Sequence, residues 1–353
     1  MTQAAKRSDD AVPVAILGAT GAVGQRFVSL LDGHPWFRVT ALAASERSEG
    51  KRYGEAVRWF LDRPIPDWAR DMPVVACRPD GEARIAFSGL DASVAGSIEE
   101  EYASAGAAVV SNSRNHRMDA DVPLLVAEVN ADHLDLVAEQ RRRRSNGGFI
   151  VTNPNCSTIG LVMSVAPIHR ALGVTRLLVS TMQAVSGAGY PGVPSVDILD
   201  NVIPYIGGEE EKVETETLKI LGGPRAPAAF PVSAQCHRVH VSDGHTLAVS
   251  VETRERAAPE EATEILGSFR SSLGALGLPS LPERPILVRS EADRPQPRFD
   301  RMEGNGMVVT VGRVRRCKVL NLKFVALVHN TIRGAAGCAI LNAELIKARG
   351  LLG

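Results

Sequence analysis

The chain has 353 residues, of which 44% are hydrophobic and 23% charged, and its 40 Lys and Arg residues balance 40 Asp and Glu residues. This is a globular composition with room for two domains, and the zero net charge gives no sign of a nucleic-acid-binding or membrane-surface protein. The five cysteines are widely spaced and odd in number, which argues against a disulfide scaffold and favours a reducing, cytoplasmic location. We expect no signal peptide, because residues 1–10 lack an apolar core, and no membrane span.

The first predicted elements are a strand, a glycine-rich turn and a helix. Residues 12–17 (Val-Pro-Val-Ala-Ile-Leu) are typical of a buried strand, residues 18–24 (Gly-Ala-Thr-Gly-Ala-Val-Gly) of the turn, and residues 25–31 of a helix. Glycines at such a turn let the main chain approach a pyrophosphate at the helix N-terminus. The spacing is G-x-x-G-x-x-G instead of the usual G-x-G-x-x-G. The location of this glycine motif directly after a predicted strand is therefore the stronger indication of a dinucleotide-binding fold. The candidate cofactor-binding residues here are Gly18, Thr20, Gly21, Ala22 and Val23.

The second predicted strand, residues 37–43, leads into a polar loop that bears on cofactor choice. Glu46 is placed where an acidic residue would bind the adenosine ribose of NAD. Arg47, with Ser45 and Ser48 close by, instead offers donors for a 2′-phosphate, which favours NADP. The alternative is a solvated loop whose charges face water.

The remainder of the first half continues as predicted parallel strands. We expect strands at 83–87, 107–110 and 149–152, a helix at 98–105, and irregular structure at 50–80. Polar residues that follow a strand in such a sheet line its ligand crevice. Residues 111–118 (Ser-Asn-Ser-Arg-Asn-His-Arg-Met) hold two candidates for an anion there, Arg114 and Arg117, and the sequence does not separate them.

A Pro/Asn turn at residues 153–158 (Asn-Pro-Asn-Cys-Ser-Thr) runs directly into an apolar stretch of helical length that ends near Arg170. Cys156 falls in the first turn of this predicted helix, with Asn155 or Ser157 as its cap. Unpaired main-chain N–H groups and the helix dipole favour thiolate over thiol there, so we interpret Cys156 as a nucleophile. A small, partly buried, inert cysteine fits this stretch equally well.

The second half mixes strands and helices with long connections, which predicts an α+β domain. Strands are expected at 174–182, 307–314 and 319–328 and in a hairpin over 234–252 that turns at Asp243-Gly244. A glycine-rich loop is expected at 183–192, a turn-rich passage at 201–208, and helices at 209–221, 260–276 and 331–345. The predicted fold class is α/β, with a Rossmann-type dinucleotide-binding domain and a second α+β domain. The last helix could return to the first domain.

Several segments, taken in order, resemble aspartate-β-semialdehyde dehydrogenase of the branch found in archaea and fungi. The resemblance is carried by residues 18–24, 153–158, 183–189 (Gln-Ala-Val-Ser-Gly-Ala-Gly), 209–212 (Glu-Glu-Glu-Lys), 236–239 (Cys-His-Arg-Val), His245 and 333–337 (Arg-Gly-Ala-Ala-Gly). It implies the reaction of aspartate semialdehyde, NADP and phosphate to give 4-aspartyl phosphate and NADPH, which runs reductively in the biosynthesis of Lys, Met, Thr and Ile. It also implies an NADP-binding domain at 1–154 completed by helix 331–353, a catalytic and dimerisation domain at 155–330, and a homodimer or homotetramer.

The resemblance assigns roles that single residues would not reveal. It implies that Cys156 is the nucleophile, His245 the acid/base and Gln183 the residue that orients the thioester. It places the substrate carboxylate and phosphate on Arg238 and Arg117, with Asn155, Glu209 and Lys212 completing that site, and the cofactor also on Ser186, Gly187 and Asn330. No metal is implied.

The chemistry needs such groups. A thiolate can displace phosphate and form a thioester that a hydride reduces. A histidine, with an unperturbed pKa of roughly 6.5, suits proton transfer near neutral pH. The planar guanidinium of arginine suits the binding of carboxylates and phosphates. Taken alone, His245 would merely follow a turn, Gln183 would be a loop residue, and residues 209–212 would be a solvated helix face. A metal trio of His237, His240 and His245 is disfavoured, because strand alternation puts His237 and His240 on opposite faces.

Three other functions compete with this interpretation. Malonyl-CoA reductases resemble the same branch, and N-acetyl-glutamyl-phosphate reductases share the fold but differ in the cysteine motif. Arg117, Glu209 and Lys212 favour phosphate over CoA by analogy. A nucleotide-binding homologue without catalysis is the alternative from another class, and the intact Cys156, Gln183 and His245 argue against it.

Overall fold

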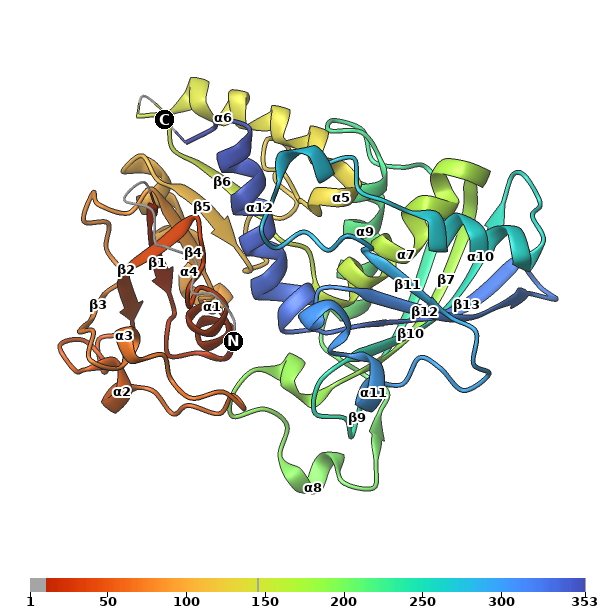
Figure 1. The fold of residues 1–353 in the computed structure, drawn as a ribbon, viewed down its shortest axis with the longest axis horizontal. Helices are drawn as coiled ribbons and strands as arrows, with labels where there is room; N and C mark the ends of the chain where they lie inside the picture. The colour runs from red at the N-terminus through yellow and green to blue at the C-terminus, as the bar shows by residue number, and fades with distance from the viewer. Residues whose placement is uncertain (1–10, 145, 353) are drawn as a thin grey trace. The chain divides into compact units, whose positions relative to one another are not determined.

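The computed structural model describes residues 11–144 and 146–352 (Figure 1). These residues form two compact units. Unit 1 comprises the described residues up to Leu125, His133–Asn153 and the residues from Ala339 onwards, and unit 2 comprises Val126–Asp132 and Pro154–Cys338. Each unit contains one sheet, and each is described by itself.

Unit 1 is built on a six-stranded sheet in the order β3-β2-β1-β4-β5-β6, with every neighbouring pair parallel. The strands are β1 Val12–Leu17, β2 Phe37–Ala44, β3 Val74–Ala76, β4 Ile85–Ser88, β5 Ala108–Ser111 and β6 Phe149–Thr152. The main unit 1 helices are α1 Ala22–Leu30, α4 Ala92–Ser104 and α6 Val137–Arg143. This strand order is that of the dinucleotide-binding Rossmann fold, which confirms the fold predicted for the first half.

Two sequence-based expectations for unit 1 were wrong in detail. Residues 50–80 were expected to be irregular, but they contain α2 Tyr53–Ala56, α3 Asp67–Arg70 and the edge strand β3. A three-residue strand is too short to show a pattern, and β3 exists because it pairs with β2. Helix α4 begins at Ala92 instead of residue 98, because the carboxylate of Asp91 caps it by accepting from the main-chain N of Ser93 at 2.9 Å.

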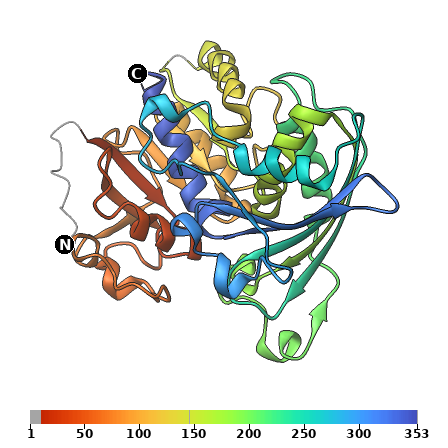
Figure 2. The same ribbon diagram turned by 45° about the vertical axis from the view of Figure 1, so that its right-hand side comes forward.

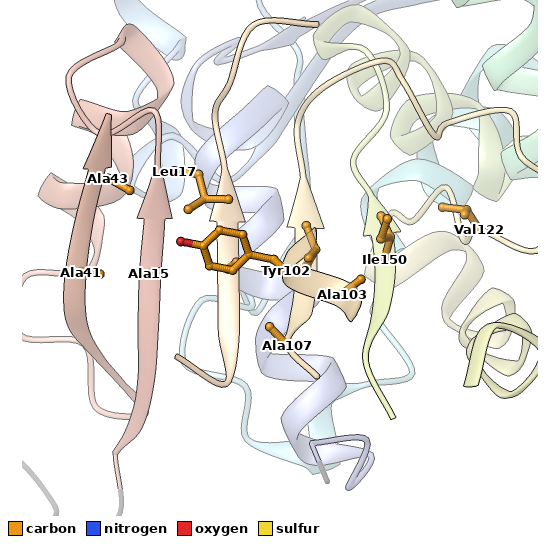
Figure 3. Packing of buried hydrophobic residues seen from close by; sticks show 11 residues of the cluster. Ala15, Leu17, Ala41, Ala43, Tyr102, Ala103, Ala107, Val122 and Ile150 are labelled. Carbon is orange, nitrogen blue, oxygen red and sulfur yellow. The ribbon is translucent and has the colours of Figure 1, made fainter. Parts of the chain in front are cut away.

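One hydrophobic cluster holds α4 against the unit 1 sheet. Figure 3 shows Tyr102 and Ala103 of α4 over side chains from β1, β2 and β6, and the labelled members of the cluster are almost fully buried. The hydroxyl of Tyr102 donates to the carbonyl of Arg78 at 2.9 Å, which satisfies the polar end of this buried ring. The same contact places Arg78 at the edge of the cluster, near the ends of β2 and β3.

Unit 2 is built on a mixed seven-stranded sheet in the order β11-β12-β13-β10-β7-β9-β8. The strands are β7 Val174–Gln183, β8 Val202–Ile203, β9 Val232–Val239, β10 His245–Thr253, β11 Ile286–Arg289, β12 Val309–Arg316 and β13 Leu322–Val328. Helices α7 Cys156–Leu172 and α10 Pro259–Ser268 lie on one side of the sheet (Figures 1 and 2). Side chains on the opposite face, such as Leu178 at 45% exposure and Ala248, are accessible in the single chain.

Helix α9, Glu209–Leu221, lies along β9 and completes its hydrogen bonding. Strand β8 pairs with just two residues of β9. Further along the same strand, the main-chain N–H groups of Ala234 and Cys236 donate to the carboxylates of Glu214 and Glu210 at 2.9 and 3.0 Å. Glu210 and Glu214 of α9 therefore satisfy main-chain N–H groups of β9 near the edge of the sheet.

The expected hairpin at Asp243-Gly244 is absent from unit 2 as described. Strands β9 and β10 do not pair with each other, because β7 lies between them, parallel to β9 and antiparallel to β10. The chain does reverse direction at Asp243-Gly244, as predicted, but β9 and β10 each pair with β7 and not with one another. The helix expected at 260–276 is also shorter, since α10 ends at Ser268, and β11 was not predicted.

The C-terminal segment begins as a π-helical turn, η5 Ile332–Ala336, and continues as α12 Gly337–Ala348. From Ala339 onwards it belongs to unit 1. There Asn342 Nδ2 donates to the carbonyl of Leu125 and to Oδ1 of Asn153, and His34 Nε2 lies 2.9 Å from Glu344 Oε1. These contacts tie the end of the chain to the Rossmann unit.

The remaining short elements connect these parts: α5 Ala127–Asn130, η1 Ala131–Leu136, η2 Val185–Ala188, α8 Ser195–Ile198, η3 Gly274–Leu276, α11 Pro297–Asp300 and η4 Glu303–Gly306. Across residues 11–144 and 146–352, none of the helices combines the length and apolar character needed to cross a membrane.

Candidate active site

Cys156 is the first residue of α7, where the sequence placed it. Asn155 caps the helix, and its Oδ1 accepts from the main-chain N of Ser157 at 2.9 Å and of Thr158 at 3.3 Å. The capping alternative, Ser157, is buried inside the first turn. The thiol therefore lies at the positive end of a 17-residue helix, an environment that stabilises a thiolate.

His245, the first residue of β10, faces this thiol. Its Nε2 lies 3.1 Å from Sγ of Cys156, and its Nδ1 accepts a hydrogen bond from the main-chain N–H of Ala184 at 3.0 Å. The imidazole is fully buried. Burial, together with the nearby Arg238 and His329, lowers the pKa of His245 to about 3.

Arg238 and Gly187 complete the surroundings of the histidine. Arg238 is nearly buried near the end of β9, and its Nη1 donates to the carbonyl of Ala184 at 2.8 Å. Burial lowers the pKa of this guanidinium. A Cβ on Gly187 would lie 2.9 Å from Arg238 Nη1 and 3.1 Å from His245 Cε1, so the glycine lets the main chain pass close to both groups.

Gln183 ends β7 in the same region. Its side chain is buried and its Nε2 donates to Oγ1 of Thr181 at 3.2 Å. In the β7–β9 ladder Gln183 is the register partner of Arg238. The predicted glutamine and arginine are therefore neighbours on adjacent parallel strands, which sequence order alone did not reveal.

Asn155 also joins the cysteine helix to α9. Its Nδ2 donates to Oε1 of Glu209 at 2.7 Å, and Lys212 Nζ lies 3.3 Å from the other carboxylate oxygen. The main-chain N of Asn155 donates to Oε2 of Glu216 at 2.6 Å. Glu209 and Glu216 are buried, so the solvated helix face that residues 209–212 suggest in isolation is the wrong interpretation.

Glu216 is a site residue that sequence reasoning missed. It occupies one face of α9 with Glu209, Val213 and Ile220, and all four are buried. The sequence contained a signal for this residue: Glu209 and Glu216 share the helical spacing of the apolar residues Val213 and Ile220. A carboxylate on such a buried face needs a hydrogen-bonding partner, which indicates a polar site.

The predicted cofactor residues of unit 2 lie together. Asn330 Nδ2 donates to Oγ of Ser186 at 2.8 Å, and its Oδ1 accepts from the main-chain N of Gly244 at 2.8 Å. Gly334, in the π-helical turn η5, belongs to the segment 333–337 that carries the family resemblance, but no site role was predicted for it. A Cβ there would lie 2.9 Å from Cβ of Cys156, so the main chain of this turn packs directly against Cys156.

In unit 1, the glycine turn between β1 and α1 has the close packing that a pyrophosphate site needs. Gly18 has φ +74°, and a Cβ on Gly24 would lie 2.1 Å from the Gly18 carbonyl oxygen. Gly21 caps α1 and is exposed, and Thr20, Ala22 and Val23 around it are partly accessible. The main chain at this helix N-terminus is therefore open to an anionic ligand and fits a dinucleotide.

A pocket of about 530 Å³ lies at the ends of β2 and β3 in unit 1. Ser45, Glu46 and Arg47 from the predicted adenosine loop line it, together with Arg78, which the sequence did not indicate. Ser48 follows in the same turn and its main-chain N donates to the carbonyl of Ser45. Glu49 and Glu101 also line this pocket, so it offers two arginine forks for a phosphate and carboxylates that suit ribose hydroxyls.

The two anion candidates after β5 differ in environment. Arg117 is 8% exposed, and its Nη2 donates to the carbonyl of Asn112 at 2.7 Å, whereas Arg114 is exposed. A side chain held in place by the protein is the better-organised ligand. No group of three His, Cys, Asp or Glu side chains that could hold a metal occurs among residues 11–144 and 146–352.

Comparison with known proteins identifies the family. Residues 13–137 match the model of the semialdehyde dehydrogenase NAD-binding domain, and residues 165–333 match that of the semialdehyde dehydrogenase dimerisation domain. Aspartate-semialdehyde dehydrogenase of Methanothermobacter thermautotrophicus is 54% identical over 344 residues, which covers 95% of this chain and 99% of the relative. The chain belongs to the aspartate-semialdehyde dehydrogenase family.

Solved structures of aspartate-semialdehyde dehydrogenases share the whole fold. The Candida albicans enzyme, crystallised with NADP, matches with a TM-score of 0.90 and 44% identity over 97% of this chain and 99% of its own. Aspartate-semialdehyde dehydrogenase II of Vibrio cholerae, crystallised in complex with ASA, matches with a TM-score of 0.75 and 29% identity over 96% of this chain and 98% of its own. The family and fold class predicted from the sequence are thus confirmed, including a dimerisation domain.

Proposed function

We propose that this chain is an aspartate-semialdehyde dehydrogenase that interconverts 4-aspartyl phosphate and aspartate 4-semialdehyde with NADP and phosphate. The reductive direction serves the biosynthesis of Lys, Met, Thr and Ile. The observation that carries the proposal is the 3.1 Å contact between Sγ of Cys156 and Nε2 of His245 at the first turn of α7. In this proposal Cys156 attacks the acyl carbon, His245 acts at the oxygen of the tetrahedral intermediate, and Gln183 orients the thioester.

NADP is the proposed cofactor, and the Candida relative crystallised with NADP supports it. The glycine turn Gly18, Thr20, Gly21, Ala22 and Val23 would hold the pyrophosphate, and Ser45, Arg47 and Ser48 the 2′-phosphate, with Arg78 added from the pocket geometry. Ser186, Gly187 and Asn330 would contact the nicotinamide end. When bound, NADPH supplies the hydride that reduces the thioester.

The proposed ligands of the substrate carboxylate and phosphate are Arg238 and Arg117, with Asn155, Glu209 and Lys212. Burial of Arg117 and exposure of Arg114 favour Arg117 as the phosphate ligand. The Vibrio relative complexed with ASA supports aspartate semialdehyde as substrate. Malonyl-CoA reductase remains the second candidate, because it requires the same thioester chemistry.

We further propose a homodimer or homotetramer and a cytoplasmic location. The open face of the unit 2 sheet, with Leu178 exposed, lies within the matched dimerisation domain and supports association. All five cysteines lie in the described part of the chain and are thiols instead of disulfides, which suits a reducing compartment. The proposed division assigns 1–154 and 331–353 to NADP binding and 155–330 to catalysis and dimerisation.

The deciding assay mixes the purified protein with aspartate semialdehyde, phosphate and NADP and follows NADPH absorbance. We expect turnover that requires phosphate and disappears in the Cys156→Ala variant. A folded protein that gives no NADPH with phosphate but oxidises NADPH in the presence of malonyl-CoA would overturn the proposal in favour of the second candidate.

Arg47→Ala is expected to raise the KM for NADP by about tenfold to 150-fold, because a charge-assisted hydrogen bond contributes roughly 1.5–3 kcal/mol. The KM for NAD, which lacks the 2′-phosphate, should change less than about twofold. Steady-state kinetics with both cofactors tests this.

Arg38→Ala is the matched control, since it removes the same charge from a 54%-exposed side chain elsewhere in unit 1. Equal losses with NADP and NAD in the Arg47 variant would rule out the phosphate contact. Arg78→Ala, measured in the same way, tests the second arginine of the pocket.

A further inference from the structure

A buried carboxylate on α4 contacts the carboxyl ends of two neighbouring strands of the unit 1 sheet. Glu99 is fully buried, and its Oε1 accepts hydrogen bonds from the hydroxyl of Ser88 at 2.6 Å and from the hydroxyl of Ser111 at 2.7 Å. Ser88 is the last residue of β4 and Ser111 the last residue of β5, and both are fully buried. One oxygen atom therefore joins two strand ends at the edge where ligands bind in a doubly wound sheet.

Both contacts have the length of charge-assisted hydrogen bonds. Hydroxyl donors lie about 2.5–2.7 Å from the oxygens of ionised carboxylates, and the two distances to Glu99 fall in this range. Burial raises the pKa of Glu99, whereas the hydrogen bonds from Ser88 and Ser111 and the nearby His116 and Arg117 act in the opposite direction. These four partners come from β4, from β5 and from the segment that follows β5.

The segment after β5, residues 112–118, is attached to α4 through Ser111, and we call it the β5 loop. The Oγ of Ser111 that donates to Glu99 also accepts from the main-chain N of Ser113 at 3.0 Å. The hydroxyl of Ser113 donates to Oδ1 of Asn115 at 2.6 Å, and Nδ2 of Asn115 donates to the carbonyl of Ala92 at 2.9 Å. A continuous chain of hydrogen bonds thus links the loop to α4 at two points, Glu99 and Ala92.

The packing of α4 against the β5 loop is close. A Cβ on Gly96 would lie 3.0 Å from Nδ2 of Asn115, so a side chain at this position would push the loop away from the helix. The second carboxylate oxygen of Glu99, Oε2, lies 3.9 Å from Nε2 of His116. Both oxygens of the buried carboxylate are therefore directed at the loop and at the residue that begins it.

Arg117 is the functional side chain that this loop carries. It is almost fully buried, and its Nη2 donates to the carbonyl of Asn112 at 2.7 Å, so the loop itself holds the guanidinium. Asn112 follows Ser111 directly in the chain. The position of the guanidinium thus depends on the course of the β5 loop, which begins at the hydrogen bond between Ser111 and Glu99.

We propose that Glu99 is a positioning residue for the phosphate ligand: by accepting from Ser111 it holds the β5 loop against α4 and keeps Arg117 in the geometry that binds phosphate. The fully buried carboxylate contributes an acceptor oxygen to the loop and does not itself meet the ligand. This inference rests on the proposed function, in which Arg117 binds phosphate, and it adds the residue that organises Arg117.

Such a role predicts an effect on phosphate and not on the other substrates. A guanidinium that is already in place binds phosphate without first having to be ordered, whereas a loosened loop must lose conformational freedom on binding. Loss of the anchor should therefore raise the KM for phosphate. The KM values for aspartate semialdehyde and NADP should change little.

The decisive comparison is between Ser111→Ala and Ser88→Ala in the full-length protein. Each substitution removes one hydroxyl donor from Oε1 of Glu99 at a fully buried position, so the two variants should lose similar stability, measured by urea unfolding. Ser111→Ala also releases the main-chain N of Ser113. Ser88→Ala leaves the loop contact of Ser88 intact, because its main-chain carbonyl accepts from Nδ2 of Asn112.

We expect the KM for phosphate to rise about tenfold in Ser111→Ala, as for the loss of roughly one hydrogen bond, and less than about twofold in Ser88→Ala. Equal changes in the two variants would overturn the proposal, because they would show that the carboxylate matters for stability alone. An unchanged KM for phosphate in Ser111→Ala would overturn it as well.

Glu99→Met and Glu99→Gln test the carboxylate itself. Methionine has a similar length and offers no oxygen acceptor, whereas glutamine keeps an oxygen within reach of both hydroxyls. We expect the KM for phosphate to rise about tenfold or more in the Met variant and less than about threefold in the Gln variant. A folded Met variant with the parent KM would overturn the proposal, and if this variant does not fold, the two serine variants decide.

Amide hydrogen exchange measures the order of the β5 loop without depending on activity. The main-chain N–H of Ser113 is bonded to Oγ of Ser111, so its protection should fall about tenfold in Ser111→Ala and stay within about twofold of the parent in Ser88→Ala. Unchanged protection in Ser111→Ala would overturn the anchor. Faster exchange without a rise in the KM for phosphate would overturn the positioning role.

Arg117→Ala separates a failure of this inference from a failure of the proposed function. It should raise the KM for phosphate at least as much as Ser111→Ala, because it removes the ligand itself. Phosphate-dependent turnover with an unchanged KM in Arg117→Ala would overturn the inference and the role of Arg117, but not the reaction. A parent protein without phosphate-dependent turnover would overturn the proposed function, and the exchange comparison then tests the anchor by itself.

Discussion

Cys156→Ser is expected to lower kcat for phosphate-dependent oxidation of aspartate semialdehyde by about 10⁵-fold or more, as for the loss of a covalent nucleophile. A serine hydroxyl stays protonated near neutral pH even at a helix N-terminus, so the attacking anion is lost while the side chain keeps its size. Steady-state NADPH formation measures the change.

Cys317→Ser provides the matched control for this substitution. Cys317 lies in the β12–β13 connection, where the main-chain N of Leu320 lies 3.3 Å from its sulfur, and it has no proposed catalytic role. It should keep turnover within about twofold, since surface changes away from special features have small effects. Thiol-reagent kinetics on both variants then identify the reactive cysteine, and a Cys156→Ser protein that retains more than about a hundredth of the parent kcat would exclude it as the nucleophile.

Glu128→Gln is expected to lower the free energy of unfolding by about 3–5 kcal/mol. The substitution removes the carboxylate of a buried salt bridge and leaves the buried guanidinium of Arg333 without a counter-charge. Arg333 and Glu128 are both fully buried, and their two parallel contacts measure 2.9 and 2.8 Å. The glutamine amide keeps one acceptor but presents an N–H to the guanidinium. Urea unfolding at a fixed protein concentration measures the difference.

This loss should also reach the active site. Arg333 belongs to the π-helical turn η5, and its neighbour Gly334 packs against Cys156. We therefore expect kcat to fall in Glu128→Gln even under conditions in which the protein remains folded. Such a fall would mean that the Glu128–Arg333 salt bridge holds in place the turn η5, which packs against Cys156.

Asp71→Asn is the control for the buried pair. Asp71 pairs with Arg52 at 3.2 Å, but the two side chains are 71% and 66% exposed. The same isosteric neutralisation should cost less than about 1 kcal/mol there, since water screens the pair. Similar losses for Glu128→Gln and Asp71→Asn would show that burial does not set the strength of the Glu128–Arg333 contact.

Local sequence was sufficient wherever an interaction spans a few residues. The glycine turn at residues 18–24, the Asn155 cap and the start of α7 at Cys156 all depend on neighbours within about one helical turn. The bounds of α9, Glu209–Leu221, agree with those predicted, because its composition and its flanking glycines are local signals. These features place Cys156 at a helix N-terminus without any tertiary information.

Pairings between distant segments were decided by the tertiary structure. Strands β9 and β10 looked like a hairpin because they are adjacent in sequence, yet each gains more by pairing with β7, whose residues lie more than 50 positions earlier. The same sheet places Gln183 beside Arg238. The hydrophobic periodicity of β9 or of β10 does not show that each pairs with β7, because β7 is distant from both in the sequence.

The chemical state of the site likewise depends on tertiary contacts. The sequence by itself determined the family, the dinucleotide-binding half and the residue types of the site: Cys156, His245, Gln183 and Arg238. Only the tertiary structure brought the N–H of Ala184 to Nδ1 of His245, buried Glu209 and Glu216 against Asn155, and added Arg78 to the pocket of Arg47. Residue type follows from the sequence, but protonation and burial follow from which distant groups displace water around it.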